Sequence, residues 1–201
     1  MTKLFWILGG VAVVAIAGCA ALIAGRNVEQ PPYTSIALDG DFELRDYPEL
    51  TVAEVTTTGG RQQAVSAGFG PLAGYIFAKE RDGDKIAMTA PVTQTQIAGE
   101  ESEDGAWVVR FIMPSEYTLD TLPRPAGSSV RLQTLPARRM AAVKFSGVAN
   151  DTLIAEQEVR LLDWMTAQGL APTATPTYAY YNDPFTPGFM RRNEVMMPVN
   201  K

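Results

Sequence analysis

The sequence of 201 residues contains no histidine and only one cysteine, and these two scarcities exclude several classes of function. Without histidine there is no Ser–His–Asp triad, no imidazole general base and no imidazole ligand for zinc or haem iron. A single cysteine allows no internal disulfide and no cysteine cluster for zinc or an iron–sulfur centre. The composition therefore argues against histidine-dependent enzymes and many metalloenzymes.

Basic residues are also few. The chain has 17 Lys and Arg against 22 Asp and Glu, which gives a net charge of −5. Because proteins that bind nucleic acid backbones need clustered positive charge, we expect no nucleic-acid partner. Hydrophobic residues make up 46% and charged residues 19% of the chain, as in an ordinary folded protein. The length is sufficient for a sizeable core.

The N-terminus carries a long uncharged run from Leu4 to Gly25. Its 22 residues are about the length that a helix needs to cross a bilayer. Lys3 precedes the run, so the positive-inside rule places the N-terminus in the cytoplasm and the rest of the chain outside it, on the periplasmic or cell-envelope face. We therefore expect a signal or membrane anchor over residues 1–26, followed by a polar tether over residues 27–34.

The residues Ile16 to Cys19 offer a second interpretation of this run. Small residues before a cysteine, after an apolar stretch, resemble the lipobox of bacterial lipoproteins. That resemblance implies cleavage before Cys19 and lipidation of its thiol. The apolar run continues beyond Cys19 to Ala24, as it would in an uncleaved transmembrane anchor. Both alternatives stay open, and both attach the same domain to a membrane.

The remaining chain contains an internal repeat. Residues 42–59 and 130–147 align without gaps at an offset of 88 positions. Each copy is typical of a strand, a proline turn, a second strand and a terminating glycine. The identical pairs are Leu44/Leu132, Pro48/Pro136, Ala53/Ala141, Val55/Val143 and Gly59/Gly147.

A helix and two more strands are expected after each copy. In the first half an apolar stripe predicts a helix over 65–76, in which Pro71 predicts a kink or a late start. In the second half Asn150 or Asp151 caps a helix that ends at Gly169. Alternation predicts the strands that follow the helices, over 86–96, 107–113, 177–181 and 194–199.

The expected fold class follows from this order of elements. A ββαββ unit used twice predicts an α+β domain over residues 35–201. Its strands form a distorted antiparallel β-barrel or curled sheet flanked by two helices. Each half is too small to bury a core alone, so the two halves are expected to form one domain.

Two motifs resemble those of the SOUL haem-binding family. Lys85 to Val92 (KIAMTAPV) resembles the family's MT-x-PV signature, and Tyr181 to Val195 resembles its Y-[ND]-x-P-x-x-P…RRNEV ending. Residues 42–47 also resemble the opening strand YE-x-R-x-Y, with phenylalanine in place of the first tyrosine. The resemblance covers residues 35–199. It implies the duplicated β–β–α–β–β fold and non-catalytic binding of haem or another tetrapyrrole.

The resemblance also implies where the tetrapyrrole binds. In this family the first helix and neighbouring residues supply the apolar wall of the site. The alternative is that this stripe is simply the core face of the helix. The positions that correspond to the wall here are Val65, Phe69, Leu72, Ala73, Ile76 and Met88.

The sequence lacks two features that such a site needs, namely cations on the first helix and a histidine ligand for iron. Outward positions of the first helix that can carry cations in the family are Ser66, Pro71 and Gly74 here, and after Arg61 no cation occurs until Lys79. Arg138 or Arg139 could replace them, but neighbouring strand residues face opposite sides, so at most one could serve.

Since the chain has no histidine, the remaining iron ligands are Met, Tyr, Lys or Cys. Tyr75 on the helix and Met88 are conceivable ligands, whereas Cys19 belongs to the membrane segment. We therefore expect weak binding without histidine ligation. We also expect Arg191, Arg192 and Glu194 of the second motif to form an ion-pair network that stabilises the fold.

Two other classes of function remain open alongside tetrapyrrole binding. The domain could be an enzyme acting on a planar apolar small molecule, with Asp, Glu, Tyr or Lys as its acid–base groups. It could also be an envelope interaction protein with no role in haem binding. A deep pocket with a buried carboxylate would favour the enzyme, and an exposed apolar patch would favour the interaction protein.

Overall fold

The computed structural model describes residues 28–79, 81–97 and 105–201. The predicted membrane segment and Cys19 lie outside the described residues. Within those residues, no helix combines the length and apolar character needed to span a membrane.

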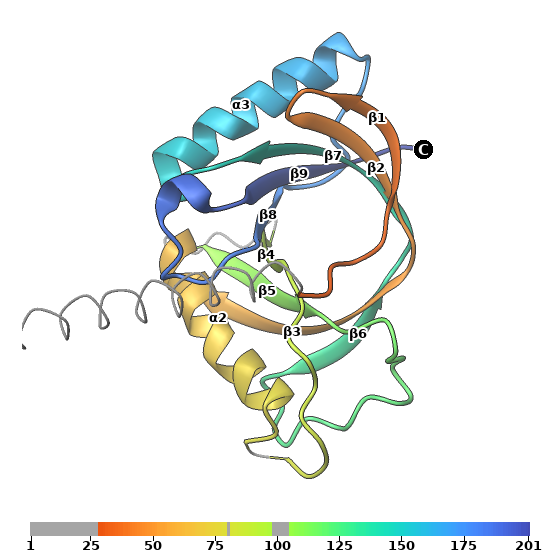
Figure 1. Ribbon diagram of the computed structural model, residues 1–201, viewed down its shortest axis with the longest axis vertical. Helices are drawn as coiled ribbons and strands as arrows, with labels where there is room; N and C mark the ends of the chain where they lie inside the picture. The colour runs from red at the N-terminus through yellow and green to blue at the C-terminus, as the bar shows by residue number, and fades with distance from the viewer. Residues whose placement is uncertain (1–27, 80, 98–104) are drawn as a thin grey trace, which may run out of the picture.

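Two α-helices, nine strands and one short 3₁₀ helix make up the described chain (Figure 1). The helices are α2 (Arg61–Ile76) and α3 (Asp151–Ala167), and the 3₁₀ helix is η1 (Gly188–Met190). The strands are β1 (Thr34–Asp39), β2 (Phe42–Tyr47), β3 (Leu50–Thr58), β4 (Val92–Gln96), β5 (Ala106–Ile112), β6 (Arg131–Leu135), β7 (Arg138–Phe145), β8 (Thr177–Tyr180) and β9 (Asn193–Val199).

All nine strands form one antiparallel sheet in the order β1-β2-β7-β9-β8-β4-β5-β3-β6. The sheet curls around an interior but does not close, because β1 and β6 remain at its two edges (Figure 1). The α+β class and the curled sheet are therefore confirmed, whereas the alternative of a distorted barrel is not, because the sheet is not closed. Closure would need β1 to pair with β6, and each has a partner on one side only.

The strand order reveals the duplication predicted from the repeat. Replacing each strand of the first half by its counterpart 88 residues later turns β2, β3, β4 and β5 into β6, β7, β8 and β9. That exchange reverses the order of the sheet from β2 to β6, so the two halves are related by an approximate twofold between β4 and β8. Gly59 and Gly147 both have positive φ, at 106° and 113°, after equivalent strands. The repeat is therefore structural, and each half pairs with the other.

Helix α2 begins at Arg61, earlier than its apolar stripe suggested, and continues through Pro71. The predicted late start is therefore wrong. Pro71 lacks an N–H, which leaves the carbonyl of Ala67 without its helical donor. Both residues are exposed, so water can hydrate that carbonyl. The opposite face of α2 packs on β3 and β5 through Leu72 and Ile76.

Helix α3 follows the prediction closely. Asn150 is the N-cap, and its side chain accepts a hydrogen bond of 2.8 Å from the backbone N–H of Leu153. Gly169, with φ at 69°, follows the C-cap. Leu161 and Met165 are fully buried against β7 and β9, so α3 covers the second half of the sheet as α2 covers the first.

Two elements differ from expectation near the N-terminal half of the domain. The strand predicted over 86–96 begins only at Val92, because Pro91 cannot donate to a ladder. An additional strand, β1, pairs with β2 and is exposed along its whole length. Earlier still, Glu29 of the predicted tether accepts hydrogen bonds from the backbone N–H groups of Ala90 and Ser115.

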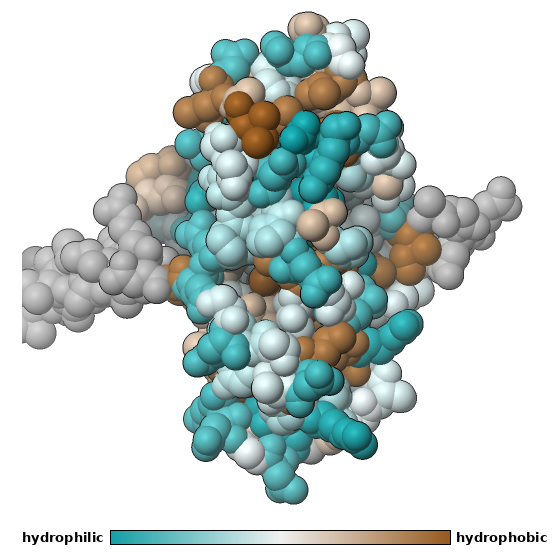
Figure 2. Space-filling model, turned by 90° about the vertical axis from the view of Figure 1, so that its right-hand side faces the viewer, coloured by the Kyte–Doolittle hydropathy of each residue, from teal (hydrophilic) through white to brown (hydrophobic). Residues whose placement is uncertain are grey.

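The side of the molecule that carries the sheet edges is mainly polar. Figure 2 shows this side as a largely hydrophilic surface with separate apolar patches. Exposed apolar residues of β1, such as Leu38 at 71% exposure, are of the scattered kind that folded proteins tolerate. The face in Figure 2 is therefore a solvated surface around the edge of the sheet.

The interior of the curled sheet holds a buried ion network. Alternation along β7 directs Ala141 and Val143 toward α3, and Met140 and Ala142 into the interior. Within that interior Glu194 is completely buried. It accepts hydrogen bonds from Arg45 at 2.8 and 3.1 Å, from Arg192 at 2.7 and 3.1 Å, and from the Tyr181 hydroxyl at 2.8 Å.

The predicted ion-pair network is therefore present, with one change of membership. Arg45, which the motif did not suggest, is the second cation on Glu194. Arg191 instead donates to the backbone carbonyls of Thr186 and Pro184 and shapes the loop before η1. The RRNEV motif thus identified the anion, Glu194, and one of its two cationic partners, Arg192. It did not identify Arg45, which is distant in the sequence.

Close packing between α2 and β5 supplies a first test. A Cβ built on Gly68 would lie 2.7 Å from two side-chain carbons of Val109, so Gly68→Ala is expected to destabilise the fold by about 1–3 kcal/mol. Gly70→Ala is the matched control, because nothing lies within 4 Å of a Cβ there. On helix propensity alone the control should gain up to about 1 kcal/mol. Urea unfolding of both variants measures the difference, and equal stabilities would contradict this packing.

Glu194→Gln tests the buried network. The change leaves Arg45 and Arg192 without their shared counter-ion, which is expected to cost about 3–5 kcal/mol of unfolding free energy. Asp46→Asn is the control, because its pair with Arg139 is partly solvated on both sides and should matter far less. Denaturant unfolding at neutral pH checks this, and a loss no larger than that of the control would refute the assigned role of Glu194.

The same carboxylate predicts a pH dependence. Burial alone would raise the pKa of Glu194, but the hydrogen bonds and charge of Arg45 and then Arg192 outweigh it and lower the pKa below its ordinary value of 4.5. A lowered pKa stabilises the folded state above pH 4.5, and that contribution is lost as the pH falls through the folded-state value. Unfolding free energies from about pH 7 to pH 3 should therefore fall more steeply for the wild type than for Glu194→Gln. Parallel profiles would be inconsistent with this.

Candidate functional site

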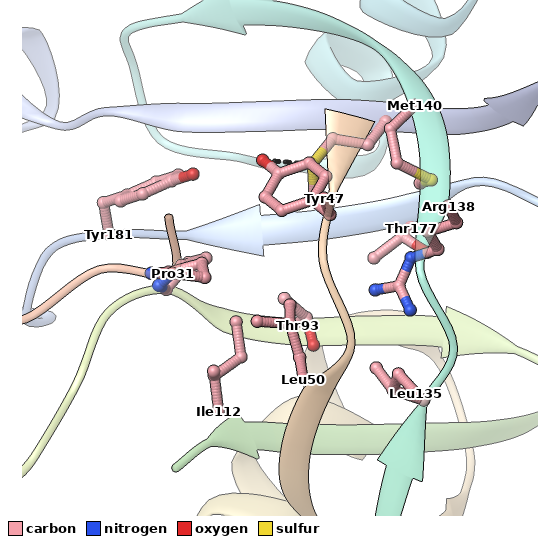
Figure 3. Close-up of a pocket in the computed structure, with 12 residues that line it drawn as sticks. Pro31, Tyr47, Leu50, Thr93, Ile112, Leu135, Arg138, Met140, Thr177 and Tyr181 are labelled. Carbon is pink, nitrogen blue, oxygen red and sulfur yellow. Dashed lines mark hydrogen bonds between the residues drawn. The ribbon is translucent and has the colours of Figure 1, made fainter. Parts of the chain in front are cut away.

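Two cavities in the described part of the chain differ in their chemistry. The first, which we call the α2 groove, lies on the surface beside the C-terminal half of α2 and has a volume of about 360 Å³. The second, the interior cavity, lies inside the curled sheet and has a volume of about 20 Å³, enough for one or two water molecules (Figure 3).

The predicted wall residues divide between core and surface. Leu72, Ala73 and Ile76 are buried, and Leu72 and Ile76 belong to the cluster that holds α2 on the sheet. Val65 packs on the edge of the same cluster. Phe69 is 40% exposed and makes an edge-to-face contact with Phe111 across 5.3 Å between ring centroids.

Met88 does not belong to the apolar cluster that contains the helix stripe. It lies in the irregular segment before β4 and is 44% exposed. Neither it nor any of the other five predicted wall residues lines the α2 groove or the interior cavity. The structure thus brings the helix residues together on one face, which is directed mainly at the sheet.

The helix wall of the α2 groove includes two glycines, which have no side chain. Gly70 and Gly74 lie on α2 with nothing within 4 Å of the Cβ position, and Pro71 is exposed between them. The opposite wall is the segment that links β5 to β6. The lining residues are Gly70, Pro71, Gly74, Tyr75, Lys79, Arg81, Pro125, Ala126, Gly127, Ser129 and Val130.

Two cations stand at one end of the groove. Lys79 is exposed, and its backbone N–H donates to the carbonyl of Gly74. Arg81 is fixed, since its guanidinium donates to the backbone carbonyls of Tyr75, Asp82 and Asp84 over 2.8–2.9 Å. It also lies 5.1 Å from the centroid of the Tyr75 ring. The groove therefore combines glycine, proline and alanine residues with two basic side chains.

Tyr75 lines the groove with its aromatic ring, because its hydroxyl is already hydrogen-bonded. Its side chain is 5% exposed, and the hydroxyl donates to the carbonyl of Pro123 at 2.8 Å. Burial raises the pKa of Tyr75, an effect that the nearby charge of Arg81 only partly offsets. The phenolate that could ligate iron is therefore disfavoured, and Tyr75 contributes an aromatic floor.

The interior cavity combines apolar walls with a few polar groups. Figure 3 shows Tyr47, Thr93, Arg138 and Thr177 around the same space, with Leu50, Leu135 and Met140 between them. The lining residues are Pro31, Tyr47, Leu50, Pro91, Thr93, Ile112, Leu135, Arg138, Met140, Thr177, Tyr181 and Met196.

Arg138 and Arg139 face opposite sides of β7, as the alternation predicted. Arg139 donates to both carboxylate oxygens of Asp46 at 2.8 Å. Arg138 lines the interior cavity instead. At most one of the two can therefore serve a given ligand, and neither lines the α2 groove.

Sequence reasoning missed the α2 groove as a site because the glycines that open it carry no periodic signal. Three glycines within one helix weaken the prediction of a helix, yet Gly70 and Gly74 produce its open face. The other wall, which includes Pro125 to Gly127, comes from the segment between β5 and β6, and only its packing near α2 makes it part of the groove. Across the described ranges, no group of three or more Cys, Asp or Glu residues is arranged to hold a metal ion.

Curated relatives of this chain carry haem-binding names. The chain is 28% identical over 191 residues to "Heme-binding protein 2" of Homo sapiens, which covers 92% of each protein. It is 29% identical over 161 residues to "Heme-binding protein 2" of Mus musculus, which covers 79% of this chain and 78% of that protein.

A solved structure and a family comparison complete the assignment. The crystal structure of the EcmrR C-terminal domain superposes with a TM-score of 0.58 at 16% identity, over 84% of this chain and 98% of that one. At this identity the likeness concerns the fold alone. The family described as "SOUL heme-binding protein" matches residues 28–198. Because the match spans nearly the whole described chain, this protein belongs to the SOUL haem-binding family.

Proposed function

We propose that this protein binds haem or a related tetrapyrrole in the α2 groove, as a binding protein and not as an enzyme. The observation that carries the proposal is the pairing of an open, glycine-lined helix face with two cations, Lys79 and Arg81, at its end. Membership of a haem-binding family supports the ligand class. The names of the two mammalian relatives support it as well.

The groove fits the chemistry of a tetrapyrrole. Such a ligand offers a flat apolar ring system and acidic propionates along one edge. Gly70, Pro71 and Gly74 present a face that a planar ring can approach without steric conflict. Lys79 and Arg81 provide the positive charge that propionates require. The volume of about 360 Å³ falls in the range of ordinary ligand sites.

Binding in this groove would rest on ring contact and charge rather than on strong iron ligation. The chain has no histidine, the Tyr75 hydroxyl is buried and already bonded, and Met88 lies away from the groove. We therefore propose that haem and iron-free protoporphyrin bind with similar, modest affinity. A strong preference for the iron form would indicate ligation by some other residue.

Gly74→Leu tests the site with little effect on the fold, because a Cβ at position 74 has open space and a longer side chain would fill the groove. Titration with hemin and protoporphyrin, followed by absorbance and tryptophan quenching, should show binding to the wild type that falls about tenfold or more in the variant. Ala155→Leu on the exposed face of α3 is the control and should bind like the wild type.

The same titration distinguishes the groove from the helix stripe that the family resemblance implies. Lys79→Ala should weaken both ligands, whereas Phe69→Ser should not, because Phe69 does not line the groove. The reverse ranking would move the site to the face of Val65 and Phe69. Absence of any spectral change at tens of micromolar ligand for the wild type would reject tetrapyrrole binding itself.

We further propose that the N-terminal apolar run holds the domain at a membrane, outside the cytoplasm. The support is the uncharged stretch from Leu4 to Gly25 after Lys3. A lipid on Cys19 and an uncleaved helix are the two possible anchors, and the intact mass of the membrane-extracted protein separates them.

Deletion of residues 2–26 tests the anchor. The full chain is expected in the membrane fraction and the deleted chain in the soluble fraction, because the deletion removes the only long uncharged apolar run in the sequence. Retention of the deleted chain on membranes would contradict an N-terminal anchor. Release of the full chain by high salt alone would do the same, since apolar insertion resists salt.

A further inference from the structure

The loop between β8 and β9 carries the two most exposed large apolar side chains of the described ranges. Phe185 is 93% exposed and Phe189 is 80% exposed. Met190, in the same loop, is 47% exposed. Single apolar residues are common on protein surfaces, but three large ones within six residues are of the kind that marks an interaction surface. We call these three side chains the loop patch.

The backbone of this loop is held by its own polar groups. The Asp183 carboxylate accepts hydrogen bonds from the backbone N–H groups of Phe185 at 2.8 Å and of Thr186 at 3.0 Å. The Arg191 guanidinium donates to the carbonyls of Pro184 at 2.6 Å and of Thr186 at 2.7 Å. These bonds order the loop without using its apolar side chains, which therefore stay available for a partner.

The base of the loop lies where the N-terminal segment joins the domain. The backbone N–H of Arg192 donates to the side-chain oxygen of Asn182 at 2.6 Å, which closes the loop. The guanidinium of Arg192 donates to the side chain of Gln30 at 3.1 Å. Figure 1 shows the loop, with the short helix η1, on the side of the molecule opposite the sheet edges β1 and β6. The mainly polar surface in Figure 2 belongs to the edge side.

The proposed N-terminal anchor brings this part of the domain close to a membrane. The uncharged run ends at Gly25, and only three residues separate it from Glu29, which already pairs with the segment before β4. The four steps from Gly25 to Glu29 span at most about 15 Å. A lipid on Cys19 would leave a longer segment, but its first residues, Ala20 to Ala24, are apolar.

The charge of the loop is compatible with a lipid surface. The segment from Tyr181 to Asn193 contains one acidic residue, Asp183, and two basic ones, Arg191 and Arg192. It therefore does not share the negative net charge of the whole chain. Anionic headgroups would attract this segment weakly and would not repel it.

From these observations we infer that the loop patch docks on the interface of the bilayer that holds the N-terminal anchor. This inference rests on the proposed anchor and adds a second contact with the same membrane. Phe185, Phe189 and Met190 insert among the headgroups and the upper acyl chains, where aromatic and apolar side chains are stable. An anchor alone leaves the domain free to rotate, whereas two contacts fix its orientation on the membrane.

Tryptophan placed in the patch tests this contact in the full chain. Phe185→Trp and Phe189→Trp are reconstituted separately into vesicles of phosphatidylcholine and phosphatidylglycerol, with and without brominated acyl chains. The emission that each variant adds to that of the three native tryptophans should shift to shorter wavelength and be largely quenched by the brominated lipid. Leu38→Trp is the control, because Leu38 is 71% exposed on the edge strand β1, and its added emission should not be quenched.

Flotation of the same samples separates this inference from the anchor. A chain that does not float with the vesicles would refute the anchor, and this inference with it. A chain that floats while neither Phe185→Trp nor Phe189→Trp is quenched would overturn the patch contact alone. Equal quenching of Leu38→Trp would also overturn it, because no side of the domain would then be preferred.

Hemin titration separates the patch from the proposed tetrapyrrole site. The double variant Phe185→Ser and Phe189→Ser should bind hemin like the wild type, because neither residue lines the α2 groove. It should also float with the vesicles, since the anchor is unchanged. A fall in hemin affinity would assign the patch to the tetrapyrrole and overturn its role at the membrane.

Discussion

Glu194, buried between two arginines, is the interaction on which the interior of this sheet depends. Its carboxylate meets Arg45 from β2 and Arg192 from the segment before β9, although β2 and β9 are not neighbours. The strand between them, β7, carries Ala142 on the interior face, and this small side chain leaves room for the bridge. A charge buried this deeply is tolerated only because every acceptor position is used, so the network selects one register for three strands.

The curvature around this network separates the two cavities. One face of the sheet packs on α2 and α3 and is continuous with the apolar core. The other face turns inward, where Arg45, Arg110 and Arg192 pair with glutamates and leave a cavity of about 20 Å³. The larger cavity of about 360 Å³ lies outside the sheet, along α2, where we propose that a tetrapyrrole binds.

The helix stripe shows why the predicted binding residues were a poor guide to the cavities. Val65, Leu72 and Ile76 follow the period of a helix, and that period reports burial without saying what the helix is buried against. Here β3 and β5 fill that space, so the stripe is mostly core. The open side of α2 has glycines and a proline, which carry no periodic signal. Lys79 was visible in the sequence as the next cation after the helix, but its place beside Pro71 and Gly74 was not.

The sequence by itself determined the element types and their duplication, the family, and the anion of the ion network. These features are local. Proline and glycine mark the ends of strands, the spacing of apolar residues distinguishes helices from strands, and motif residues are adjacent in the chain. Tertiary structure alone decided that the sheet stays open, that Arg45 joins Glu194 across 149 positions, and that Arg138 lines the interior cavity while Arg139 pairs with Asp46. Those outcomes depend on which strands become neighbours and on which side chains share one face. Contacts between distant residues fix both, and no local pattern records them.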